Sequence, residues 1–245
     1  MATRPTRYTK DPIVEALIAL RFETTIDAER VSGCVKEHFE GQPLARWKVQ
    51  VNLQHEAGGV SAQAAREPDG LALASSDGHW RLMVTPLVTS IHVMRPYPGW
   101  RALREQAGLV LGKCMSAAGG VKLAGVAVRY IDRISIPPGK PLNKYFGTTP
   151  AWPKNMPGLA VGFSSQVQTQ DEKLGIQAEL RVASAEADDE GWPTVIYDVL
   201  VSREAGTKGL SSENWLEQLD DLHDVQRSLF EASVTPSLRK LLGAE

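Results

Sequence analysis

Four extended segments follow one another between residues 47 and 94, and the later ones are separated by only a few residues. We expect strands near 47–56, 70–75, 79–85 and 88–94. The pair Asp77-Gly78 favours a tight hairpin turn between two of them, because such turns need positive φ. Strands joined by short turns run antiparallel, since a parallel pair needs a long crossover connection. This region therefore predicts an antiparallel sheet.

The rest of the chain adds strands and helices in an order typical of α+β proteins. Alternating apolar residues predict strands at 12–22, 123–136, 158–169, 174–184 and 194–203. Apolar residues at helical spacing predict helices at 27–39, 100–118, 212–231 and after Thr235. We therefore predict an α+β fold, with antiparallel sheets that carry helices on one face. Two lobes of similar architecture are compatible with this order.

A proline-rich stretch suggests where such lobes would meet. Six prolines fall between Pro137 and Pro157, a density that breaks regular structure. The predicted organisation is a mobile arm at 1–10, a lobe at 11–137, a junction at 138–157 and a second lobe at 158–245 that ends in helix.

Charge is divided unevenly between the two halves. Residues 1–140 hold 18 Lys and Arg against 13 Asp and Glu, whereas residues 141–245 hold 9 against 16. Such asymmetry concerns partners rather than fold. A basic half beside an acidic half predicts a protein partner or self-association.

Several common classes of protein lack support in the sequence. No apolar run reaches the length of about 18 residues that indicates a membrane span. Cys34 and Cys114 give no disulfide framework, and both are expected on the apolar sides of helices, which favours a reducing cytoplasm. Phosphate-binding loops, dinucleotide fingerprints, nucleophile elbows and zinc-binding motifs are absent from the sequence.

Four ordered motifs carry a resemblance to a known group of proteins. They are Pro12-Ile-Val-Glu-Ala16, Arg95-Pro-Tyr-Pro-Gly-Trp100, Arg129-Tyr-Ile-Asp-Arg133, and Leu222-His-Asp224 followed by Leu229-Phe-Glu-Ala-Ser-Val-Thr235. Together they resemble a sporadically distributed family of uncharacterised bacterial proteins of similar length. The resemblance implies no activity and no catalytic residues. Its patchy distribution suggests an accessory system such as mobile-element or phage-defence genes.

A basic stretch with aromatic neighbours is the first candidate site. Its proposed members are Arg95, Tyr97, Trp100, Arg101, Arg104, Arg129 and Arg133. Arginines beside planar rings suit phosphate contacts and base stacking, so an anionic ligand such as nucleic acid is a candidate. The same arginines could instead pair with carboxylates of the acidic half. The two prolines and Gly99 could simply direct the following helix, with Trp100 as its anchor.

Three acidic residues form a second candidate site. Asp132 and Asp198 each fall among apolar residues of a strand, where a carboxylate is costly unless it is paired or bound to metal. If Glu15 lies nearby, the three could bind Mg²⁺ or Mn²⁺ for phosphoryl transfer. A structural ion pair is the simpler interpretation of each.

The last long helix carries an acidic ridge. Its members are Glu213, Glu217, Asp220, Asp221 and Asp224. The ridge could dock a basic partner, and His223 beside it meets the minimum for acid–base chemistry.

The sequence therefore predicts a non-catalytic binding or adaptor protein without a cofactor. It would use its basic face for an anionic ligand or a protein partner. The alternative is a divalent-metal enzyme that acts on a phosphate-containing or nucleic-acid substrate.

Overall fold

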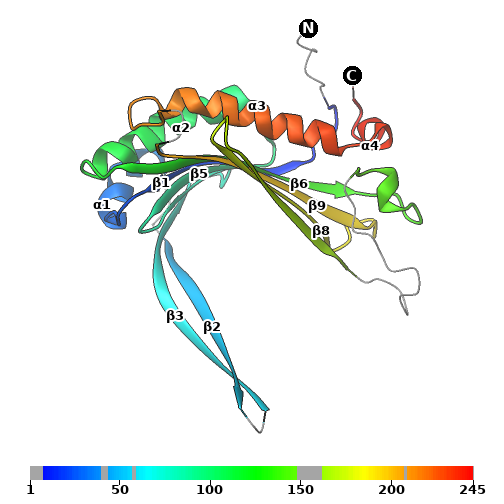
Figure 1. The fold of residues 1–245 in the computed structure, drawn as a ribbon, viewed down its shortest axis with the longest axis horizontal. Helices are drawn as coiled ribbons and strands as arrows, with labels where there is room; N and C mark the ends of the chain where they lie inside the picture. Colours follow the sequence, from blue (N-terminus) through cyan, green and yellow to red (C-terminus); the bar gives the residue numbers. More distant parts are fainter. Residues whose placement is uncertain (1–7, 40–43, 57–58, 148–161, 207–208, 245) are drawn as a thin grey trace.

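The computed structural model describes residues 8–39, 44–56, 59–147, 162–206 and 209–244. Within these ranges, nine strands form a single antiparallel sheet in the order β2-β3-β4-β5-β1-β6-β9-β8-β7. The strands are β1 (Ile13–Phe22), β2 (Leu44–Glu56), β3 (Gly59–Ala74), β4 (Trp80–Val84), β5 (Val88–Met94), β6 (Leu123–Ser135), β7 (Ser164–Asp171), β8 (Ile176–Ala185) and β9 (Thr194–Glu204). The β2–β3 hairpin extends well beyond the body of the protein (Figure 1).

Helices cover one face of the sheet and leave the opposite face open (Figure 1). They are α1 (Ala28–Gly33), α2 (Trp100–Ala117), α3 (Trp215–Ser233) and α4 (Pro236–Leu241). Helix α2 packs on β1 and β5, and α3 packs on β6 and β9. Each long helix buries residues three or four positions apart, for example Leu103, Ala107 and Val110 in α2. The predicted α+β class, with helices on one face, is therefore confirmed.

The central strands β1 and β6 join the two halves of the chain. In β1, Ala16, Ile18 and Leu20 are buried on the helix side, whereas Glu15 and Arg21 alternate onto the open face. Strand β6 pairs with β1 along one edge and with β9 along the other. The sheet is thus continuous across the proposed lobes, so the described residues form one sheet rather than two.

The chain ends and the proline-rich junction are only partly described. Tyr8 forms an antiparallel bridge with Ala244, so residues 8–10 of the expected mobile arm are held against the end of the chain. The described part of the junction contains Phe146, which is buried and stacks on Tyr197 with ring centroids 5.9 Å apart. Residues 1–7 and 148–157 lie outside the described residues.

Three local expectations differ from the structure. The helix predicted at 27–39 ends at Gly33, after which a short 3₁₀ turn follows at Lys36–His38. Strand β3 begins at Gly59, eleven residues before the predicted start at 70, because it pairs with the whole of β2. Cys34 is exposed at the end of α1 rather than buried, whereas Cys114 is buried as expected.

Two helix starts follow from capping residues. Asp27 accepts hydrogen bonds from the backbone N–H groups of Glu29 and Arg30, and Thr235 accepts one from Leu238. A short polar side chain at this position satisfies N–H groups that have no partner within the helix. Among the described residues, no helix combines the length and apolar character needed to cross a membrane.

Candidate functional site

The residues predicted to form one basic face lie on both sides of the sheet. Tyr130 and Asp132 of β6 are buried on the helix side, so Arg129 and Arg133 alternate onto the open face. Tyr97 bonds to Tyr130 and therefore lies on the helix side, at the start of α2. The alternation of β6 thus separates two of the predicted arginines from the aromatic residues meant to accompany them.

Every arginine of this set also has a partner inside the protein. The contacts are Arg95 Nη2 to the Asp11 carbonyl oxygen (2.6 Å), Arg101 to Glu105 (2.8 Å), Arg104 to Asp220 (3.1 Å), Arg129 to both carboxylate oxygens of Asp198 (2.8 and 2.6 Å) and Arg133 to the Glu186 carbonyl oxygen (3.0 Å). Arg104 and Arg129 pair with the acidic half, which is the second interpretation that the sequence allowed. Binding of an anion by this set stays a prediction.

The three carboxylates of the metal alternative are not brought together. Across the antiparallel pairs, Asp198 and Glu15 both lie opposite Ile131 and so share the open face. There Asp198 binds Arg129, and Glu15 binds His92 with 2.6 Å between Oε1 and Nδ1. Asp132 lies on the opposite face. The described residues contain no group of three His, Cys, Asp or Glu side chains that could hold a metal ion.

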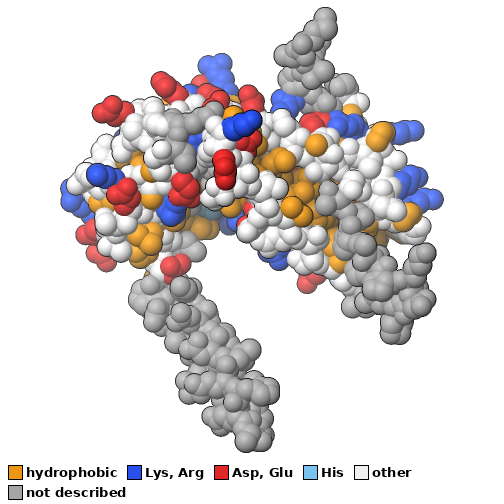
Figure 2. Space-filling view, viewed as in Figure 1, with side chains coloured by type: hydrophobic (Ala, Val, Ile, Leu, Met, Phe, Trp, Pro, Cys, Tyr) orange, Lys and Arg blue, Asp and Glu red, His pale blue; other side chains and the backbone are white. Residues whose placement is uncertain are grey.

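The acidic ridge of α3 is partly used to hold the fold together. Asp220 accepts a hydrogen bond from Trp100 Nε1 (2.9 Å), and Asp221 lies 3.4 Å from the buried Arg203. Figure 2 shows acidic side chains spread over the helix layer. Docking of a partner on this ridge stays a prediction.

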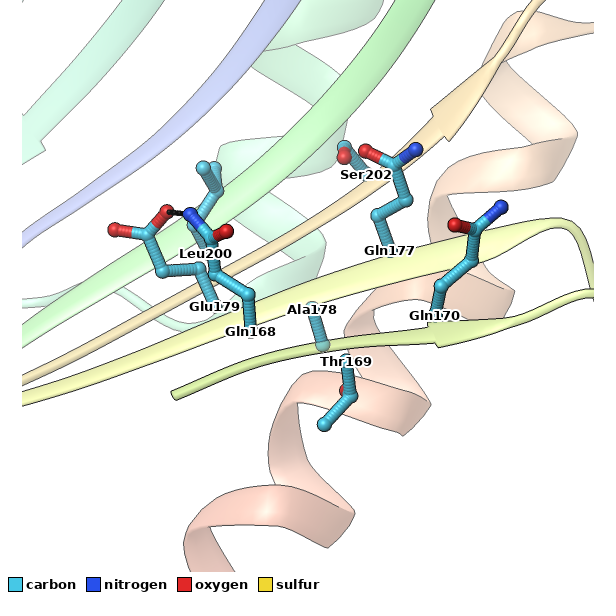
Figure 3. Close-up of a pocket in the computed structure, with 8 residues that line it drawn as sticks. All are labelled: Gln168, Thr169, Gln170, Gln177, Ala178, Glu179, Leu200 and Ser202. Atoms are coloured by element: carbon cyan, nitrogen blue, oxygen red, sulfur yellow. Dashed lines mark hydrogen bonds between the residues drawn. The ribbon is translucent and has the colours of Figure 1, made fainter. Parts of the chain in front are cut away.

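The open face bears a shallow polar cavity of about 360 Å³ over β7, β8 and β9. Gln168 and Glu179 are hydrogen bonded there and project from the open face with Gln170, Gln177, Leu200 and Ser202, whereas Thr169 and Ala178 point the other way (Figure 3). None of these groups is both buried and unpaired in the described structure. The cavity therefore lacks a group that a ligand must satisfy.

A larger pocket of about 510 Å³ lies on the helix side, where β1 begins and α2 meets α3. Four segments build it: residues 8–13, residues 97–100, β6 and the second half of α3. Its wall is largely aromatic, with Tyr8, Tyr97, Trp100, Tyr130, His223 and Phe230. Of the described residues on the wall, Asp11, Asp132 and Glu231 are acidic and Arg227 is basic.

Asp132 lies buried in the wall of this pocket. The residue is 2% exposed, and within the described residues no hydrogen bond or ion pair reaches its carboxyl group. Burial, with smaller effects from the charges of Asp11 and Asp198, raises the pKa of Asp132 to about 8. A buried carboxyl without a partner is costly, so its presence in a pocket suggests a functional role.

The neighbouring polar rings form a neutral hydrogen-bonded chain. The hydroxyl oxygens of Tyr97 and Tyr130 are 2.6 Å apart, and the Tyr130 oxygen is 3.3 Å from His223 Nδ1. Burial lowers the pKa of His223 to about 4 and raises the pKa values of both phenols. Neutral His223 can therefore accept a hydrogen bond from the Tyr130 hydroxyl, which in turn accepts a hydrogen bond from the Tyr97 hydroxyl.

Trp100 closes one side of the pocket and links α2 to α3. Its indole stacks on His223, with centroids 4.2 Å apart and an angle of 7° between the planes. Gly99 precedes it with φ of 99°, a conformation that residues other than glycine rarely adopt. The segment 95–100 therefore does direct the helix, and Trp100 is the anchor that the sequence suggested.

Sequence reasoning singled out four of the pocket side chains. Tyr97 and Trp100 were assigned to an anion site, Asp132 to a metal site and His223 to the acidic ridge of the last long helix. The spacing of His223, Gln226, Arg227 and Phe230 marks one face of a helix, but it does not reveal what that face covers. No protein-family model and no curated protein matches this chain.

Proposed function

We propose that the protein is a non-catalytic binding module and that its ligand occupies the pocket around Asp132. The observation that carries this proposal is the buried carboxyl group of Asp132, which has no partner within the described structure. A ligand that pairs with it would remove the cost of burying it alone. The volume and the aromatic wall are typical of pockets that hold small organic molecules.

Binding rather than catalysis is proposed because the polar groups of the pocket are engaged with one another. The Tyr97 and Tyr130 hydroxyls bind each other, and Trp100 Nε1 binds Asp220. Asp132 has no such partner within the described structure, so its carboxyl group is available to contact a ligand.

A fragment screen by ligand-observed NMR tests this function. The fragments should include cationic, neutral and anionic compounds, each tested on wild type and two tryptophan variants. We expect that some fragments bind wild type and that Trp100→Leu weakens them at least about tenfold, because the indole forms part of the wall. Trp192→Leu, in the loop before β9, is the matched control and should leave binding unchanged. If no fragment binds, or if both variants behave alike, the proposal fails.

A further inference from the structure

Among the described residues of the pocket wall, carboxylates outnumber cations. Glu231 already has two partners, because the Tyr8 hydroxyl donates to it over 2.9 Å and Arg239 forms an ion pair with it. Asp11 accepts a hydrogen bond from the backbone N–H of Ile13 at 3.0 Å. Asp132 is thus the carboxylate of this wall that has no partner in the described structure.

The rings around Asp132 are uncharged and offer their faces or edges to the pocket. Tyr97 and Tyr130 meet edge to face with centroids 5.5 Å apart, as do Tyr8 and Phe230 at 5.8 Å. A neutral aromatic ring attracts a cation to its face through its quadrupole. The wall therefore combines an unpaired carboxyl group with several groups that favour positive charge.

These observations together point to a class of ligand. Resting on the function proposed above, we propose that the pocket binds a small organic cation, whose ammonium, amidinium or guanidinium group pairs with Asp132 while an apolar body packs on the aromatic wall. An anionic ligand would add a further negative charge beside Asp11, Asp132 and Glu231. A neutral ligand could bond to protonated Asp132 but would gain no ion pair.

Pairing with a cation requires Asp132 to lose its proton. Since the pKa of Asp132 is about 8 without ligand, most molecules at pH 7 must release that proton on binding. The titratable and charged groups that face the pocket are Tyr8, Asp11, Tyr97, Tyr130, His223, Arg227 and Glu231. The three tyrosines and His223 stay neutral between pH 7 and pH 9, because their pKa values lie well outside that range.

Three isosteric probes test the charge preference by calorimetry: benzamidine as the cation, benzamide as the neutral form and benzoate as the anion. We expect benzamidine to bind at least about tenfold more tightly than the other two, because only it forms a charge-assisted pair. Its affinity should rise about tenfold from pH 7 to pH 9, as the ionised fraction of Asp132 rises. Titrations at pH 7 in two buffers of different ionisation enthalpy should show about one proton released per ligand.

Two variants test whether the preference for benzamidine depends on Asp132. Asp132→Asn should remove the preference for benzamidine over benzamide and its pH dependence. Asp171→Asn, at the exposed end of β7, is the control and should bind as wild type does. Circular dichroism establishes that each variant is folded, and the comparison of probes on wild type needs no variant.

The outcomes separate this inference from the proposed function. If benzamide or benzoate binds as tightly as benzamidine, or if Asp132→Asn retains the preference, the pocket binds another class of ligand and only this inference fails. A second result also overturns the inference: benzamidine does not bind at millimolar concentration, whereas neutral or anionic fragments bind wild type and are weakened by Trp100→Leu. If nothing binds at the pocket, both proposals fail.

Discussion

At the residue scale, Asp132 and His223 are each held in the uncharged form by the same pocket. The pKa of Asp132 rises to about 8 and that of His223 falls to about 4, in both cases mainly through burial. Relative to the unfolded chain near pH 5 to 6, folding moves one proton from the histidine to the aspartate. Their effects on stability therefore oppose each other over part of the pH range.

The contribution of Asp132 should appear between pH 6.5 and pH 8. Its pKa is higher in the folded state, so the folded state binds more protons and loses stability as pH rises toward 8. We expect wild type to lose about 2 kcal/mol of unfolding free energy over this interval relative to Asp132→Asn. Urea denaturation of both proteins at several pH values measures the difference, and parallel curves would contradict it.

His223→Gln provides the complementary measurement. The pKa of His223 is lower in the folded state, so this residue costs stability as pH falls from 6.5 toward 4. In wild type, the stability that His223 costs as pH falls offsets the stability that Asp132 contributes. The glutamine variant should therefore keep gaining stability on acidification through this window, relative to wild type.

At the element scale, a buried arginine ties α3 to the sheet. Arg203 of β9 is 1% exposed and bonds to Gln218 of α3, whereas its second partner Asp221 is largely exposed. A buried charge that loses a partner is far more costly than a buried pair replaced by apolar groups.

Two substitutions should therefore differ in effect. Gln218→Ala leaves the Arg203 guanidinium poorly satisfied and should cost about 3 kcal/mol of unfolding free energy. Gln218→Ala combined with Arg203→Met removes the charge as well, and we expect it to be more stable than Gln218→Ala alone. Chemical denaturation of the two variants tests this order, and the reverse order would show that Gln218 matters only through its packing.

The helices and strands were more predictable from the sequence than the way they pair and pack with one another. The alternation in β1 and the helical spacing in α2 are local, and Asp27 and Thr235 are recognisable caps, so these features could be predicted from sequence. The helix predicted at 27–39 instead ends at Gly33, and the local spacing of apolar residues did not reveal that break.

At the scale of the whole molecule, the sheet makes the two halves depend on each other. Strand β6 pairs with β9, more than 50 residues further along the chain, and nothing in their separate sequences specifies that register. The pocket depends on the same long-range pairing. Asp132 was singled out from its apolar strand face, but Trp100 and His223 meet only because α2 and α3 share one face of one sheet.

A core substitution in β6 should therefore weaken both halves together. Val128 is fully buried in the centre of the sheet, and Val128→Ala should cost about 2 kcal/mol of unfolding free energy. Hydrogen exchange measures which strands lose stability in this variant. We expect the slowest amides of β1 and β9 to exchange faster by the same factor. Acceleration confined to one strand would indicate two independently unfolding lobes.

The bridge between Tyr8 and Ala244 has a further consequence for engineering. It brings the two ends of the described chain side by side (Figure 1), and Tyr8 is itself part of the pocket wall. A short linker could join these ends, and the chain could be reopened at the Asp77-Gly78 turn without interrupting a strand. In such a circular permutant, continuous backbone joins the two former ends. A fluorescent domain inserted at this junction would report on occupancy of the pocket.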